Sequence, residues 1–244
     1  MRERRTRRPV WRVLLGVLLA LVLSAVIYVS DYYHADETAL AVLKNPDPAV
    51  EVSVEKGRVV FAPEEPEAGL IFYPGGKVEY TAYAPLMEKL AREGVLCVVV
   101  KMPLNLAVLN PNAAEGIPAE FPDVDVWAVG GHSLGGVMAA DYAAKHPRDV
   151  DALVLLAAYS TADLTGSDLP VLSVYGTEDG VMGMDQYGKY RDNLPEGVTE
   201  LAIRGGCHAQ FGSYGAQRGD GVPTVSAGEQ QSVTAEAIRD LLIP

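Results

Sequence analysis

The chain has 244 residues and a formal net charge of −12. Its first twelve residues carry +5, from six arginines and one glutamate, so the rest of the chain carries −17. A body this acidic offers no electrostatic footprint for nucleic acid and is repelled by anionic lipid head groups, so nucleic acid is excluded as an expected partner.

The N-terminal thirty residues have the pattern of a membrane segment. Residues 1–12 form a basic flank, and residues 13–30 form an uncharged run rich in Leu and Val. Such a run reaches the length that a helix needs to cross a bilayer, and its basic flank is expected to stay in the cytoplasm. We predict an uncleaved signal anchor in the cell membrane, which places the rest of a single-pass protein outside the cytoplasm. A cleaved signal peptide with a weak site at Val22-Leu23-Ser24, giving a secreted protein, is the alternative.

About 210 residues follow, enough for one domain with a single core. Residues 31–49 are interpreted as a polar connector and residues 50–244 as the domain. Apolar runs on either side of Glu55-Lys56-Gly57 predict a hairpin. Beyond it, strands are expected at 69–73, 95–101, 124–129, 151–158, 169–175 and 199–203, and helices at 83–93, 137–145 and 226–242.

This alternation of strands and helices predicts an α/β domain. Its sheet should be mostly parallel, with helices on both faces, and its functional groups should lie at the carboxyl ends of the strands. Two cysteines, Cys97 and Cys207, fall near opposite ends of the expected sheet. Their Cα atoms would then be too far apart for a disulfide, so we expect free thiols.

The segment Gly131-His132-Ser133-Leu134-Gly135 lies between an apolar run and a helical stretch. A strand-to-helix turn this tight leaves no room for side chains two positions before and two positions after the serine. The serine itself is then strained, with its hydroxyl exposed at the sheet edge and backbone N–H groups beside it. Ser133 is therefore the candidate nucleophile.

A serine hydroxyl needs an imidazole to accept its proton, and the imidazole needs a carboxylate to fix its tautomer. Of the four histidines, His208 alone lies in a glycine-bordered loop after a late strand, so it is the expected base. For the acid, Asp179 follows the strand at 169–175, and Glu178 and Asp163 compete with it. The sequence thus supplies nucleophile, acid and histidine in that order.

In this order, with each group just past the carboxyl end of a predicted strand, the sequence resembles the α/β-hydrolase superfamily from about Val50 onward. It is most similar to the small dienelactone-hydrolase-like or carboxylesterase-like members. The resemblance implies the α/β-hydrolase fold and favours Asp179, because the acid usually follows this strand in a Gly-x-x-Asp turn. Some members take the acid one strand earlier, which keeps Asp163 as the alternative. Only residues 159–168 stand where members often insert a cap domain, so no cap domain is expected.

An acyl-transfer site also needs N–H donors for the oxyanion that forms during attack. The resemblance implies the N–H of Leu134, directly after the nucleophile, and a second N–H from the loop after the strand at 69–73. That loop is Pro74-Gly75-Gly76-Lys77, with proline where family members often carry histidine. We expect the N–H of Gly76 or Lys77 to be the second donor, because proline has no N–H.

These residues predict a serine hydrolase that cleaves a small-molecule or lipid carboxylic ester through an acyl-enzyme. Two alternatives use the same fold: an acyltransferase with the same triad, and a catalytically inactive binding protein. No cluster of His, Cys, Asp or Glu has metal-ligand spacing, and the glycine-rich stretches lack the phosphate-loop pattern. Neither a metal nor a cofactor is therefore expected, and the sequence specifies no oligomeric state.

Overall fold

The computed structural model describes residues 10–243. It divides into two compact units, one up to Tyr32 and one from Tyr33 onward. The first unit contains helix α1 (Val10–Ser30), none of whose side chains is buried. With 21 residues the helix is about 32 Å long, which is long enough for the hydrocarbon core of a bilayer. Among the described residues α1 is the one helix long and apolar enough to cross a membrane, and it includes the segment predicted at 13–30.

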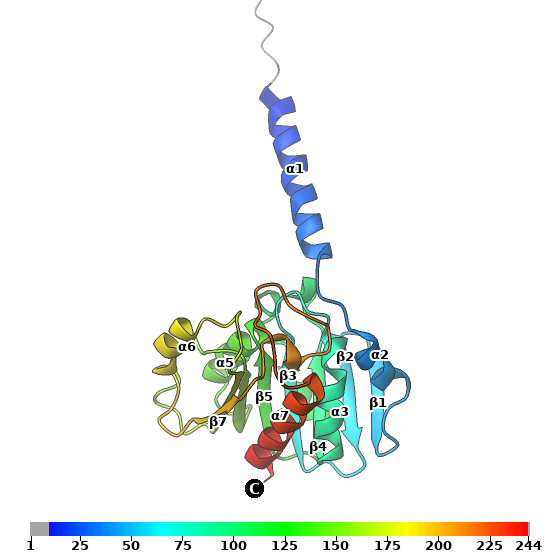
Figure 1. Cartoon of the computed structure of the whole chain (residues 1–244), viewed down its shortest axis with the longest axis vertical. Helices are drawn as coiled ribbons and strands as arrows, with labels where there is room; N and C mark the ends of the chain where they lie inside the picture. The colour runs from blue at the N-terminus through cyan, green and yellow to red at the C-terminus, as the bar shows by residue number, and fades with distance from the viewer. Residues whose placement is uncertain (1–9, 244) are drawn as a thin grey trace, which may run out of the picture. The chain divides into compact units, whose positions relative to one another are not determined.

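The second unit is built on a single sheet of eight strands (Figure 1). The strands are β1 (Val50–Glu55), β2 (Arg58–Pro63), β3 (Ala68–Tyr73), β4 (Val95–Val100), β5 (Trp127–His132), β6 (Ala152–Leu156), β7 (Val171–Gly176) and β8 (Thr199–Ile203). Their order across the sheet is β1-β2-β4-β3-β5-β6-β7-β8. β2 runs antiparallel to β1 and β4, and every other neighbouring pair is parallel. The predicted α/β architecture with a mostly parallel sheet is confirmed.

Helices cover both faces of this sheet. The α-helices are α2 (Glu37–Lys44), α3 (Ala84–Arg92), α4 (Ile117–Glu120), α5 (Leu134–Lys145), α6 (Met184–Arg191) and α7 (Ala227–Leu242). Short 3-10 turns are η1 (Tyr80–Tyr83), η2 (Pro103–Asn105), η3 (Ala107–Leu109) and η4 (Ala209–Phe211). In Figure 1, α3 and α7 lie in front of the sheet. Between β6 and β7 there is only a short loop, so no cap domain is inserted there.

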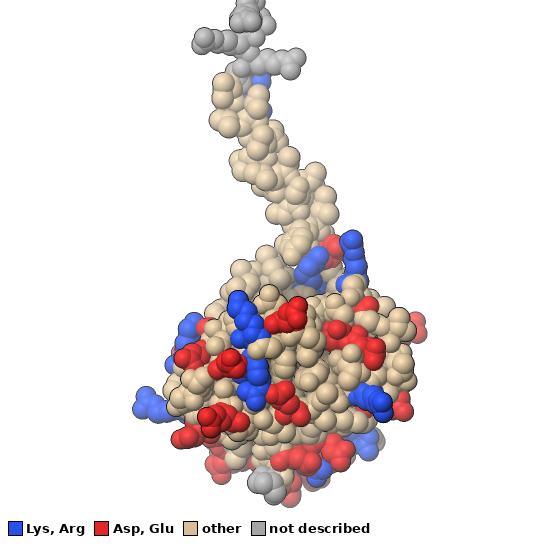
Figure 2. Space-filling view, turned by 60° about the vertical axis from the view of Figure 1, so that its left-hand side comes forward, with Lys and Arg blue, Asp and Glu red and all other residues tan. Residues whose placement is uncertain are grey.

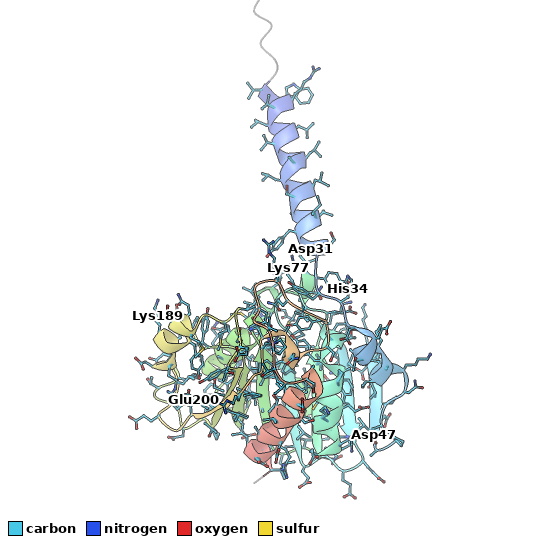
Figure 3. The ribbon with its side chains drawn as sticks, in the orientation of Figure 1. Asp31, His34, Asp47, Lys77, Lys189 and Glu200 are labelled. Carbon is cyan, nitrogen blue, oxygen red and sulfur yellow. The ribbon has the colours of Figure 1, made fainter. Side chains whose placement is uncertain are left out.

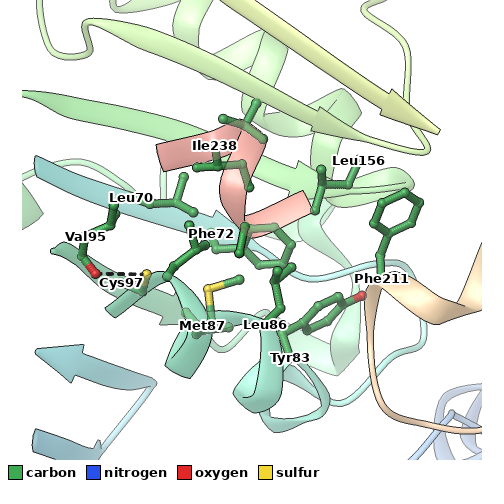
Figure 4. Packing of buried hydrophobic residues seen from close by; sticks show 14 of the residues in the cluster. Leu70, Phe72, Tyr83, Leu86, Met87, Val95, Cys97, Leu156, Phe211 and Ile238 are labelled. Carbon is green, nitrogen blue, oxygen red and sulfur yellow. Dashed lines mark hydrogen bonds between the residues drawn. The ribbon is translucent and has the colours of Figure 1, made fainter. Parts of the chain in front are cut away.

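The two faces of the sheet carry separate cores because side chains alternate along each strand. In β3, Leu70 and Phe72 pack with α3 and α7, whereas Ile71 and Tyr73 belong to the core under α5. Figure 4 shows Phe72 between the side chains of α3 and Ile238 of α7. Each such fully buried side chain stabilises the fold by about 1.5–3 kcal/mol. Since β3 is buried on both faces, it reads in the sequence as a continuous apolar run.

One strand differs from its prediction. The apolar run at 124–129 predicts a strand there, but β5 begins at Trp127 and continues to His132. Val124 is buried outside the strand, and its carbonyl accepts a hydrogen bond from Trp127 Nε1 at 3.0 Å. Val124 therefore looks like a buried strand residue in the sequence, although it lies in the turn before β5.

The segment 33–49, interpreted above as a connector, packs on the domain. Tyr33 forms a parallel bridge with Val78, donating its N–H to the Lys77 carbonyl at 2.7 Å and accepting the N–H of Glu79 at 2.8 Å. Further along, Asp47 pairs with Arg92 Nε at 3.3 Å. Figure 3 labels Lys77 at the top of the domain and Asp47 at its lower right. The segment thus runs from the loop after β3 to the C-terminal end of α3 before β1 begins.

Candidate active site

The turn between β5 and α5 holds Ser133 in a conformation that few non-glycine residues adopt. Its φ and ψ angles are 53° and −122°. Backbone strain of this kind costs about 1–3 kcal/mol and persists only where the surroundings enforce it. Here the Ser133 N–H donates to the Leu156 carbonyl at 2.9 Å, and its carbonyl accepts the N–H of Val137 at 3.1 Å. The serine is therefore fixed between a neighbouring strand and the first turn of α5.

The glycines on either side of Ser133 are required by close backbone approach. A Cβ atom on Gly135 would lie 2.1 Å from the Tyr73 carbonyl oxygen, and one on Gly131 would lie 2.5 Å from the Gly135 carbonyl carbon. Real Cβ contacts are not this short, and the atoms they would meet are backbone. Residues 131 and 135 must therefore be glycine because any side chain there would collide with the backbone, as the sequence predicted.

Asp179 and His208 meet in a buried hydrogen-bonded pair. Asp179 Oδ2 lies 2.8 Å from His208 Nδ1, and both side chains are 1% exposed. The other oxygen, Oδ1, accepts the N–H groups of Val181 and Met182, each at 2.8 Å. A carboxylate oxygen only accepts hydrogen bonds from a ring N–H, so His208 Nδ1 is the donor in this contact. A neutral imidazole held in this way has its lone pair on Nε2, which is the tautomer that a general base needs.

Ser133 and His208 line the same pocket, which has a volume of about 290 Å³. Nε2 of His208 is buried and has no hydrogen-bond partner among the described residues, so it is not bonded to the Ser133 hydroxyl. Catalytic hydrogen bonds often close only when substrate binds. The remaining wall is largely apolar and includes Leu134, Val137, Ala157, Ala158, Val181 and Met182.

The two competing acids lie elsewhere. Glu178 is exposed and accepts a hydrogen bond from Thr177 Oγ1 at 3.0 Å. Asp163 accepts the N–H and the hydroxyl of Thr165, which holds its pKa below the usual value. Of the three carboxylates, Asp179 is the one that His208 contacts.

The loop after β3 lies against the start of α5. A Cβ atom on Gly76 would lie 3.1 Å from Leu134 Cδ2. The N–H groups of Gly76 and Leu134 have no acceptor within the described residues. Lys77, the other expected donor, has a φ of 59° and gives its N–H to the Asn105 carbonyl at 2.8 Å. The geometry leaves the Gly76 N–H available for an oxyanion and engages the Lys77 N–H elsewhere.

Two buried aromatic side chains connect this loop to the nucleophile elbow, which is the turn of residues 131–135 that carries Ser133. Tyr83 Oη accepts the N–H of Gly75 at 2.9 Å and lies 2.9 Å from His132 Nδ1. Burial raises the pKa of Tyr83, so its hydroxyl keeps the proton that it can donate to His132. Burial, and secondarily the nearby His208, lower the pKa of His132 well below its usual value, so this imidazole is neutral. Tyr83 and His132 therefore form a neutral hydrogen-bonded link between the loop and Ser133.

Sequence reasoning identified neither Tyr83 nor Asp220, which both contact the loops of the site. The Asp220 carboxylate accepts backbone N–H groups from the turns that carry Asp179 and His208. Asp220 lies between Gly219 and Gly221, which is the pattern of an ordinary surface turn. The one feature of the sequence that could have indicated Asp220 is its position between two glycines in the loop after His208.

The two cysteines are free and buried. Cys97 Sγ donates to the Val95 carbonyl at 3.3 Å within β4 (Figure 4). Cys207 directly precedes His208, and burial, together with the neighbouring Asp220, raises its pKa to about 11. Within residues 10–243, no group of three or more His, Cys, Asp or Glu side chains could hold a metal ion.

Comparison with known proteins concerns the fold and the family of the chain. The chain resembles the crystal structure of TT1662 from Thermus thermophilus, with a TM-score of 0.59 and 14% sequence identity, over 80% of this chain and 99% of that one. At that identity the likeness concerns the fold. No curated protein sequence matches the chain. A family model described as the alpha/beta hydrolase family matches residues 69–232, which include the elbow, the acid turn and the histidine turn. With this match over most of its length, the chain belongs to the alpha/beta hydrolase family.

Proposed function

We propose that the protein is a serine hydrolase that cleaves carboxylic esters through Ser133, His208 and Asp179. The observation that carries the proposal is the buried Asp179–His208 pair, 2.8 Å apart, in which His208 lines the same pocket as Ser133. Membership of the family supports hydrolysis in general terms. The ester substrate and the residue roles are our inference from the site.

In the proposed reaction, Ser133 Oγ bonds to the substrate carbonyl carbon while its proton passes to His208 Nε2. The carbonyl oxygen becomes an oxyanion, which the N–H groups of Leu134 and Gly76 stabilise. The intermediate collapses, the C–O bond to the alcohol breaks, and His208 returns the proton to the departing alcohol. Water then attacks the acyl-enzyme with His208 again as base, releasing the acid and restoring Ser133.

The pocket favours a short, uncharged ester. Its volume of about 290 Å³ is at the small end of ligand pockets, and its walls are mostly aliphatic. The rest of the chain carries −17 beyond the basic flank, and Figure 2 shows carboxylates spread over the visible face among basic side chains. A field of this sign disfavours anionic substrates. A neutral ester with a short acyl chain therefore fits both the size and the charge of the site.

We also propose that α1 anchors the protein in the membrane and that the catalytic domain lies outside the cytoplasm. The support is the length and apolar composition of α1 together with the arginines before it. The test is an epitope tag at the N-terminus of the full chain, followed through membrane fractionation. A tagged band of full length in the membrane supports an anchor, whereas a short tagged fragment indicates a cleaved signal peptide. Protease added to intact spheroplasts should then digest the domain if it lies outside.

The catalytic proposal is tested by labelling the full chain in detergent with a fluorophosphonate probe and mapping the modified peptide. Label on Ser133 that disappears in Ser133→Ala and His208→Ala is the expected result. Asp163→Asn is the matched control, because it changes the competing aspartate and should leave labelling unchanged. A folded wild-type protein that takes no label contradicts the mechanism. Hydrolysis of p-nitrophenyl esters of increasing acyl length then tests the substrate class, with activity expected to fall as the chain lengthens.

A further inference from the structure

Asp220 lies in the loop that follows η4, and its carboxylate collects four backbone N–H groups. Oδ2 accepts from Ala209 at 2.8 Å. Oδ1 accepts from His208 at 3.1 Å, from Gly180 at 3.2 Å and from its neighbour Gly221 at 2.8 Å. Hydrogen bonds to a charged acceptor are about twice as strong as neutral ones. One side chain thus binds the backbone of Gly180, which follows Asp179, and the backbone of His208, the proposed base.

The two turns that Asp220 joins are far apart in sequence. Asp179 and His208 are separated by 29 positions, and their 2.8 Å contact depends on how the turns after β7 and β8 are placed. The loop of Asp220 is pressed against the acid turn, since a Cβ on Gly221 would lie 1.8 Å from the Glu178 carbonyl oxygen. Asp220 therefore lies between the turns after β7 and β8, and the placement of these two turns sets the Asp179–His208 distance.

We propose that Asp220 is a positioning residue, whose carboxylate sets the geometry of the Asp179–His208 pair through the backbone of both turns. The inference rests on the proposed function for its effect on rate. Asp220 lines a neighbouring cavity with Cys207 and Gln210 and is absent from the wall of the Ser133 pocket. It therefore acts through His208 and Asp179 and does not touch substrate.

The charge of Asp220 is part of this role. Burial raises the pKa of Asp220, but the N–H groups of Ala209, Gly180 and His208 outweigh it and leave the pKa below its usual value. The group is ionised at neutral pH and offers acceptors only. An asparagine here would turn an amide N–H₂ toward backbone N–H donors, so either the Ala209 N–H or the N–H groups of Gly180 and His208 would lose their acceptor. Asp220→Asn therefore removes the charge and at least one of these hydrogen bonds while nearly preserving the volume.

The experiment compares the full-length wild type with Asp220→Asn in detergent, by two readouts. The first is the rate of fluorophosphonate labelling at Ser133, and the second is the downfield proton NMR signal of the His208 Nδ1–H, assigned by its loss in His208→Gln. We expect labelling to slow at least tenfold and the signal to shift or vanish. Hydrolysis should lose kcat with KM within about twofold. Asp47→Asn is the matched control, because Asp47 also accepts a backbone N–H but lies at the other edge of the domain.

Retention of the wild-type signal together with labelling within twofold of wild type would overturn the proposal. If the wild type itself takes no label, the proposed function fails, and the NMR signal alone still decides whether Asp220 positions His208. Asp220→Ser, which removes the charge but keeps a small acceptor, is the second variant. Loss of cooperative unfolding in both variants would also overturn the proposal, since Asp220 would then be a folding residue.

Discussion

Tyr83 Oη and His132 Nδ1 lie 2.9 Å apart in the interior of the domain, between the start of α3 and the nucleophile elbow. Because Tyr83 Oη already accepts the N–H of Gly75, its own proton is directed to His132. The hydroxyl thereby joins the loop that carries Gly76 to the residue before Ser133. Rigid placement of these two segments is what a preorganised oxyanion site requires.

Replacing Tyr83 with phenylalanine should weaken both stability and catalysis. The variant leaves the Gly75 N–H and His132 Nδ1 buried without a partner, which costs about 1–3 kcal/mol for each unpaired group. Urea unfolding should show this loss, and labelling of Ser133 should slow because the Gly76 loop is no longer held. Tyr80→Phe is the control, since Tyr80 is half-buried and its ring contacts Lys101. Equal effects of the two substitutions would contradict the role given to Tyr83.

His132 should make the protein sensitive to acid. Its folded-state pKa lies well below that of a histidine in the unfolded chain, chiefly because of burial. The unfolded state therefore binds the proton first, so the stability present above about pH 6.5 is lost as the pH falls toward the folded-state pKa. One such proton gives a slope of at most about 1.4 kcal/mol per pH unit.

Urea denaturation of wild type and His132→Asn between pH 5 and pH 8 measures this slope. Asparagine keeps a polar atom at the position of Nδ1 and does not titrate in this range. The variant should be less stable at pH 8 and should lose less of its stability on acidification. Parallel pH profiles for the two proteins would show that other groups cause the acid sensitivity.

Residues 33–36 should matter for the α/β domain although they come only two residues after the end of α1 in sequence. Tyr33 pairs with the strand-like segment at Val78, and its hydroxyl accepts the N–H of Arg218 at 3.1 Å. Asp36 caps α2 by accepting the N–H groups of Thr38 and Ala39. A helix cap contributes about 1 kcal/mol, and so does each net backbone hydrogen bond.

A chain that lacks residues 1–30 should therefore keep its stability and labelling, whereas one that lacks residues 1–36 should melt at least about 5 °C lower. Thermal unfolding of the two truncated proteins checks this difference. The point variant Asp36→Ala in the longer protein should reproduce part of the loss. Identical melting temperatures for the two truncations would mean that the segment adds nothing to the domain.

Adding one methyl group at Gly135 in the nucleophile elbow should disrupt the fold around Ser133. Gly135→Ala places a Cβ 2.1 Å from the Tyr73 carbonyl oxygen, and the obstructing atoms are backbone that cannot rotate away. We expect a loss of at least about 3 kcal/mol in the free energy of unfolding and no labelling of Ser133. Gly166→Ala is the matched control, because a methyl group added there would have nothing within 4 Å. That change should alter stability by no more than about 1 kcal/mol.

Much of the fold could be predicted because it rests on local patterns. Apolar runs such as 95–101 are continuous since the central strands are buried on both faces, and the order of strands and helices then implies a parallel sheet. Boundaries were less predictable, as with β5, because a buried turn residue such as Val124 has the same hydropathy as a strand residue. The domain also takes in residues 33–49, whose contacts join segments too distant in sequence for any local pattern to record.

The sequence by itself determined the chemistry available to this protein. Spacing alone indicated Ser133 in a glycine-flanked turn and His208 in a late loop, because the tight turn and the strand ends impose those residue types locally. Only the tertiary structure decided which carboxylate meets His208, which N–H groups near Gly76 remain unpaired, and that Asp220 joins the two turns. The reason is physical: each of these is a distance of about 3 Å between segments separated by many residues. Such distances are set by how loops pack at the sheet edge, and the order of residues along the chain does not encode them locally.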